Sequence, residues 1–147
     1  MLESIISNRK TYHKIILDYI SDYTYRSDRY NADYSVAIVL CDSDIHLGSF
    51  LEHTRQTDKF IILEKNLCCI VLDSSPSNVG IKAASNIQTE FQSINFGKEL
   101  FTCVVTFKDY NDENKMIHTL FDILKYAVSY KIDTMVVDQG HMLRNNH

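Results

Sequence analysis

The sequence contains little proline, little glycine and no long apolar run. Among its 147 residues are one proline and four glycines, too few for an extended flexible linker or a disordered segment. No apolar stretch approaches the ~20 residues that a membrane-spanning helix needs, and Glu3 and Asp18 near the start are acids that a signal peptide would not contain. We therefore expect a single cytoplasmic domain without membrane insertion, comprising an N-terminal helix and linker at 1–30, a globular body and a polar tail at 139–147.

Basic residues are also few and scattered. Fifteen Lys and Arg residues stand against nineteen Asp and Glu, for a net charge of −4, and there is no basic stripe of the kind that nucleic-acid-binding domains carry. The four cysteines form no C-x-x-C pair, and the adjacent Cys68 and Cys69 point to opposite faces of one predicted strand. These features argue against a nucleic-acid partner and predict four core thiols rather than a metal site or a disulfide framework.

Hydrophobic periodicity predicts alternating helices and strands. Four helices are expected: at about 8–25 with a cap at Ser7 or Asn8, at 46–55, from Ser75-Pro76 to a stop at Asn95 and Gly97, and after a cap at Asp112. Five strands are expected at 34–41, 60–63, 67–72, 100–107 and 134–137. The middle of this order is βαββαβ, the split βαβ arrangement. The fold class is therefore α+β, with helices on one face of a mostly antiparallel sheet of about five strands, an N-terminal helix and an extra C-terminal αβ unit.

Several short motifs follow one another along the chain. Asn8-Arg9 precedes Tyr12, Asp42-Ser43-Asp44 follows the first strand, Arg55-Gln56-Thr57-Asp58 precedes the hairpin, and Asp122 and Tyr126 lie on the last helix. In order and spacing these resemble the N-R-x-x-F/Y, D-x-D, R-x-x-D and A-D-x-A-L-Y motifs of bacterial GGDEF signalling domains. The resemblance covers nearly the whole chain and implies the ferredoxin-like palm of nucleotidyl cyclases.

The resemblance also shows which parts of the family's chemistry are missing. Diguanylate cyclases use two acids to hold divalent metal against nucleotide phosphates. Asp42 stands at the position of the first acid, as a possible remnant of the metal site. The signature turn is replaced by Glu64, Lys65, Asn66, Leu67 and Cys68. Leu67 takes the place of the second acid and cannot ligate metal, whereas Glu64 and Lys65 replace glycines that let the backbone approach the nucleotide.

A further element is shortened, because only 12 residues separate Asp42 from Arg55, too few for the family's long helix. We therefore expect a degenerate GGDEF-like domain with no catalytic residues and no cofactor. Mg²⁺ would matter only if a residual nucleotide site exists.

Three functions remain open. The first is a non-catalytic signalling or regulatory domain that contacts a protein partner or forms a homodimer, for which the first helix offers Tyr12, Tyr19 and Tyr23 unless they cover the domain's own sheet. The second is a cyclic di-GMP receptor, in which Arg55 forks onto phosphate or guanine and Asp58 accepts from the guanine edge. These two side chains could instead form only a surface ion pair. The third is a residual nucleotide-processing enzyme that relies on Asp42.

Overall fold

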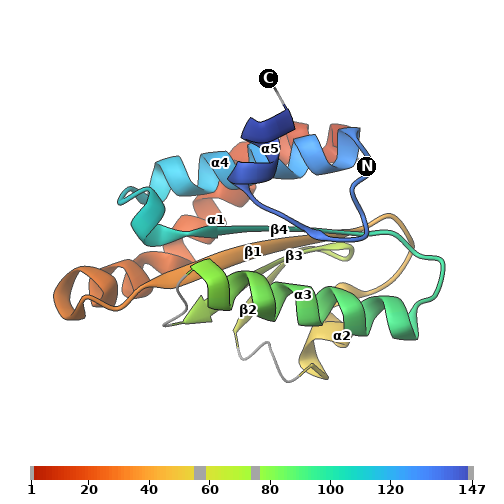
Figure 1. Cartoon of the computed structure of the whole chain (residues 1–147), viewed down its shortest axis with the longest axis horizontal. Coiled ribbons are helices and arrows are strands. Elements are labelled where there is room, and N and C mark those ends of the chain that lie inside the picture. The colour runs from red at the N-terminus through yellow and green to blue at the C-terminus, as the bar shows by residue number, and fades with distance from the viewer. Residues whose placement is uncertain (1, 55–58, 74–76, 146–147) are drawn as a thin grey trace.

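A five-stranded sheet forms the middle layer of the protein (Figure 1). The computed structural model describes residues 2–54, 59–73 and 77–145. The strands are β1 (Tyr34–Cys41), β2 (Phe60–Glu64), β3 (Leu67–Asp73), β4 (Leu100–Thr106) and β5 (Val136–Val137). They lie in the order β2-β3-β1-β4-β5, with β5 parallel to β4 and all other neighbours antiparallel. This order confirms the predicted split βαβ unit and the α+β fold class.

Helices cover both faces of the sheet. On one face lie α1 (Leu2–Tyr30), α4 (Glu113–Ser129) and α5 (Gln139–Asn145); on the other lie α2 (Leu47–Glu52) and α3 (Ser77–Ile94) (Figure 1). A short 3-10 helix, η1 (Phe107–Asp109), follows β4. The prediction of helices on one face holds only for α2 and α3, the two helices of the βαββαβ unit. The flanking helices α1 and α4 cover the opposite face.

The central strands are buried on both sides, which explains why their sequences are continuous apolar runs. Every residue of β1 and β4 is buried, and successive residues belong to different cores. Ile38 and Cys69 pack in the core beneath α1 and α4, whereas Val39 and Cys68 pack in the core beneath α2 and α3. The two adjacent cysteines therefore point to opposite faces, as predicted, and each face of the sheet has its own core.

Helix α1 begins earlier than predicted. Ser7 Oγ donates to the Glu3 carbonyl at 2.9 Å and Asn8 Nδ2 to the Ser4 carbonyl at 2.9 Å, so both side chains bond back to the preceding helical turn and neither caps the helix. The helix has 29 residues. Nevertheless, neither α1 nor any other helix in the described ranges is long and apolar enough to cross a membrane.

Two segments that the sequence analysis leaves irregular are helical. Helix α1 continues to Tyr30, without the expected linker, and stops where Asn31 adopts a left-handed conformation with φ of 55°. The expected polar tail forms α5, because Asp138 caps its start: the His141 N–H donates to Asp138 Oδ1 at 3.0 Å. In both cases a single Asn or Asp residue marks a helix end that apolar spacing does not reveal, Asn31 through its backbone and Asp138 through its side chain.

The start of α4 and the end of α3 are as predicted, whereas α2 ends at Glu52, three residues before the predicted end at 55. Asp112 caps α4 by accepting from the Lys115 N–H at 3.0 Å, and α3 is followed by Gly97 with φ of 82°. The predicted cap at Ser75-Pro76 lies outside the described residues.

Candidate functional site

The turn between β2 and β3 is fixed to the chain that follows β1. The antiparallel pairing of β1 with β3 brings the two segments side by side. The Cys41 N–H donates to the Asn66 carbonyl and the Asn66 side-chain amide donates back to the Cys41 carbonyl, both at 3.0 Å. The Leu47 N–H, at the start of α2, donates to the Lys65 carbonyl at 2.9 Å. The turn is therefore held by strand β1 on one side and by α2 on the other.

Asn66 contributes to this turn through its side chain rather than through its backbone. Asn is one of the few residues that tolerate the left-handed backbone of a tight turn. However, the residues of positive φ in the described chain do not include Asn66. A register shift between Ile62 and Glu64 lets the hairpin close instead.

Glu64 connects the turn to helix α1. The Tyr12 hydroxyl donates a short hydrogen bond to Glu64 Oε1. Burial, and then this contact with Glu64, raises the pKa of Tyr12 to about 12. A cavity of only about 130 Å³ remains between α1 and the turn, with Tyr12, Glu64 and Leu67 among its lining residues. The side chain at the position of the first signature glycine therefore bonds to the domain's own first helix.

Lys65 connects the turn to the D-x-D segment. Its Nζ lies 2.5 Å from Asp44 Oδ1, and both side chains are exposed. The hydrogen bond from Lys65, together with its charge, lowers the pKa of the Asp44 carboxyl. Asp42, the predicted remnant of the metal site, is also exposed, and its backbone N–H donates to the Glu99 carbonyl at 3.3 Å. Asp44, the last residue of the D-x-D segment, is thus already paired with Lys65 of the turn.

The donor set at the turn does not fit the divalent metal that the fold implies. Leu67, at the position of the second acid, is 1% exposed and belongs to the core beneath α1 and α4. Cys68 is buried in the opposite core, and burial raises the pKa of its thiol to about 12. Within residues 2–54, 59–73 and 77–145, no three His, Cys, Asp or Glu side chains come together as a metal site. Mg²⁺ requires clustered oxygen ligands, but of the acids in the turn and the D-x-D segment, Asp44 is paired with Lys65 and Glu64 with Tyr12.

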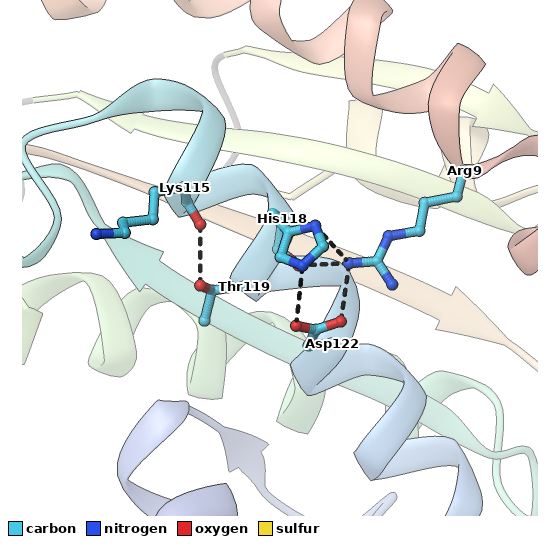
Figure 2. A network of polar contacts seen from close by, with 5 residues as sticks. All are labelled: Arg9, Lys115, His118, Thr119 and Asp122. Carbon is cyan, nitrogen blue, oxygen red and sulfur yellow. Dashed lines mark hydrogen bonds and ion pairs between the residues drawn. The ribbon is translucent and has the colours of Figure 1, made fainter.

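A second polar cluster joins α1 to α4. Arg9 Nη2 donates to the His118 carbonyl at 2.7 Å and to Asp122 Oδ1 at 2.8 Å, and it lies 3.3 Å from His118 Nδ1 (Figure 2). His118 Nε2 lies 3.5 Å from Asp122 Oδ2, and the guanidinium lies 5.6 Å from the centre of the Phe121 ring. Arg9 and Asp122 belong to separate sequence motifs, and the packing of α1 against α4 brings the two side chains together.

Beside this cluster, α1 and α4 enclose a groove of about 490 Å³. Its lining residues are Arg9, Lys10, His13, Lys14, Leu17 and His118. Sequence reasoning missed this groove because only the packing of the two helices brings His118 to the basic residues of α1. A usable signal was present in the spacing, since cationic or imidazole side chains recur four residues apart at 9 and 13 and at 10 and 14.

The remaining candidate residues divide into two groups. Tyr12 and Tyr23 are 4% and 5% exposed and belong to the domain's own core, whereas Tyr19 is 36% exposed. Thus two of the three tyrosines considered for a protein contact cover this domain's sheet. Arg55 and Asp58, the predicted cyclic di-GMP ligands, lie outside the described residues.

The fold has close counterparts among solved structures. A DGC protein from Thermotoga maritima aligns with a TM-score of 0.62 at 16% identity, over 74% of this chain and 91% of that one. The GGDEF domain of DgcB from Caulobacter crescentus, in complex with c-di-GMP, aligns with a TM-score of 0.64 at 10% identity, over 86% and 89%. A structure of the coiled coil and GGDEF domain of DgcB, also with c-di-GMP, gives 0.60 at 10%, over 85% and 79%.

The chain therefore has the fold of the GGDEF domain, the diguanylate cyclase palm. No protein-family model and no curated protein sequence matches it.

Proposed function

We propose that this chain is a non-catalytic GGDEF-like regulatory domain, which acts in signalling through contact with a protein partner or a second copy of itself. The proposal rests on the side chains of the β2–β3 turn, which are buried or bound within the chain. Leu67 is buried at the position of the second metal acid, and the side chains at the two glycine positions bind Tyr12 and Asp44.

This arrangement opposes nucleotidyl transfer for a physical reason. The reaction depends on positioning phosphates and on neutralising the charge that develops on them, which the metal ions largely supply. A hydrocarbon side chain at the second acid supplies no ligand. The Glu64 and Lys65 side chains occupy space where glycine would let a nucleotide approach the backbone. The domain needs no cofactor in this role.

The catalytic part of the proposal is tested by incubating the protein with GTP and either Mg²⁺ or Mn²⁺, followed by chromatography for cyclic di-GMP. An active diguanylate cyclase serves as the positive control. We expect no product. Product that disappears in Asp42→Asn would overturn the proposal and would support the alternative of a residual nucleotide-processing enzyme.

The contact part is tested by sedimentation equilibrium across a wide concentration range. Reversible self-association that is lost in Tyr19→Asp would identify a homodimer through the exposed side of α1. Tyr25→Asp is the matched control, since Tyr25 is 58% exposed and lies on the same helix about 120° around its axis from Tyr19. A monomer at every concentration would exclude the homodimer and leave a different protein as the partner.

A cyclic di-GMP receptor is the second candidate function. Two of the structural neighbours hold this ligand, and Arg55 and Asp58 supply the fork and the acceptor that it requires. Isothermal titration of cyclic di-GMP should then show binding that is lost in Arg55→Ala and retained in Arg144→Ala, a control at an exposed arginine on α5. Absence of heat at high ligand concentration would exclude this receptor function.

A further inference from the structure

The α1–α4 groove is basic, although the protein as a whole is acidic. The net charge of the chain is −4, yet the groove lining contains three permanent cations, two imidazoles and one leucine and no carboxylate. Asp122 stands beside it but is already bound by Arg9 and contacts His118. The lining itself therefore carries a net positive charge, which favours an anion.

The cations of the groove keep donors available. Arg9 makes its contacts with His118 and Asp122 through Nη2 (Figure 2), and no other described residue accepts from its Nη1 or Nε. These contacts fix the guanidinium in place and leave part of its fork unused. Lys10 and Lys14 are exposed and form no ion pair or hydrogen bond with the described part of the chain. They are one helical turn apart, where like charges repel, and a bound anion would relieve that repulsion.

The rest of the groove suits an organic body. His13 is held by Asn114, with Nε2 and Oδ1 3.1 Å apart, and Leu17 adds an aliphatic surface one turn beyond Lys14. Imidazole faces and lysine stems also present apolar area. The volume of about 490 Å³ lies in the range of small-molecule sites, roughly 300–1,000 Å³.

We propose that the α1–α4 groove binds a small phosphate-bearing organic anion, with its phosphates on Arg9, Lys10 and Lys14 and its body against Leu17 and the imidazoles of His13 and His118. The groove lies apart from the β2–β3 turn and requires no cyclase chemistry. The proposal therefore does not rest on the proposed function.

The test is isothermal titration with two probes, ATP and inorganic pyrophosphate, at low and at moderate ionic strength. We expect ATP to bind, and to bind more weakly as salt screens the groove. Pyrophosphate lacks the organic body and should bind about tenfold more weakly than ATP. The double substitution Lys10→Ala with Lys14→Ala should raise the ATP dissociation constant about tenfold or more.

The matched control is Lys82→Ala with Lys125→Ala, which removes the same charge from two exposed lysines outside the groove. It should change ATP affinity by less than about twofold. An equal loss in both double variants, or no ATP binding at all, would overturn the site. Pyrophosphate that binds as tightly as ATP would overturn the role of Leu17 and the imidazoles. Far-ultraviolet circular dichroism confirms that both variants fold.

Discussion

The β2–β3 turn and the α1–α4 groove both involve helix α1, but they use polar side chains differently. At the turn, Glu64 is bound by Tyr12, and Lys65 by Asp44. In the groove, Lys10 and Lys14 have no ionic partner among the described residues, and Arg9 is bound at one nitrogen only. At the turn, where the family resemblance implies a ligand, the polar side chains are paired within the chain, whereas the groove, for which the resemblance implies no ligand, keeps free donors. The two regions therefore differ more clearly in whether their polar side chains have partners than in their sequence motifs.

The largest expected effect comes from restoring an acid to the turn. Leu67→Glu should lower the free energy of unfolding by on the order of 3–5 kcal/mol, because it places an unpaired carboxylate in an apolar core. Urea denaturation measures the loss. Leu67→Met keeps the volume and should cost less than about 1.5 kcal/mol. If Leu67→Glu were as stable as the native protein, the interior of the turn would be open to solvent and the contrast with the groove would fail.

The next effect concerns the wall of the groove. Arg9→Ala should lower the free energy of unfolding by about 1–2 kcal/mol, because it removes charge-assisted hydrogen bonds and packing on Phe121. A double-mutant cycle with Asp122→Ala should give a coupling energy of about 0.5–1 kcal/mol, as expected for a partly exposed pair. Strict additivity in the cycle would show that the two side chains do not clamp α1 to α4.

A smaller effect is expected from Tyr12→Phe, which frees Glu64 and should cost about 1 kcal/mol at neutral pH. The folded-state pKa of Tyr12 is raised from 10.0 to about 12, so the folded state retains a proton that the unfolded state loses between these values. The stabilising contribution of Tyr12 is complete below pH 10 and disappears as the pH rises through about 12.

The stability difference between native protein and Tyr12→Phe, measured in urea along this pH series, should therefore shrink. Tyr30→Phe, at an exposed position on the same helix, should show no such trend. A difference that stays constant to pH 12 would contradict the Tyr12–Glu64 bond.

The smallest effect is expected at the exposed pair of the turn. Lys65→Ala should lower the urea midpoint only slightly at neutral pH, since solvent screens the pair. It should nevertheless raise the pKa of Asp44 toward its ordinary value, because Lys65 is what lowers it. The pair stabilises the fold above that ordinary range, and its contribution fades as the pH falls through the lowered pKa. Titration by nuclear magnetic resonance measures the pKa of the Asp44 carboxyl directly, and Lys98→Ala is the control. An unchanged pKa would show that the pair does not persist in solution.

The fold was predictable where burial dictates the sequence. Strands β1 and β3 are continuous apolar runs because both faces of the central sheet are covered, and the predicted strand at 34–41 has the observed bounds. Prediction failed where a single polar residue marks a helix boundary. Helix α1 ends only at the left-handed Asn31, and Asp138 caps the start of α5, and neither residue alters the apolar spacing that located the helices.

The candidate site was predictable only in part. The substitution of the signature turn is visible in the sequence, since Leu67 cannot act as an acid. The pairing of Glu64 with Tyr12 is not visible, because it joins residues 52 positions apart that only the packing of α1 brings together. The groove depends on a still longer separation, 109 positions between Arg9 and His118.

The distribution of the cysteines has a practical consequence. Cys69 and Cys103 are fully buried beneath α1 and α4, whereas Cys41 and Cys68 are fully buried beneath α2 and α3. Burial raises the pKa of each of these thiols, so each reacts slowly until its face of the sheet opens. Each cysteine pair therefore reports on one face of the sheet. The rates at which a thiol reagent labels the two pairs, resolved by peptide mass spectrometry, would measure separately how often each layer of helices detaches from the sheet.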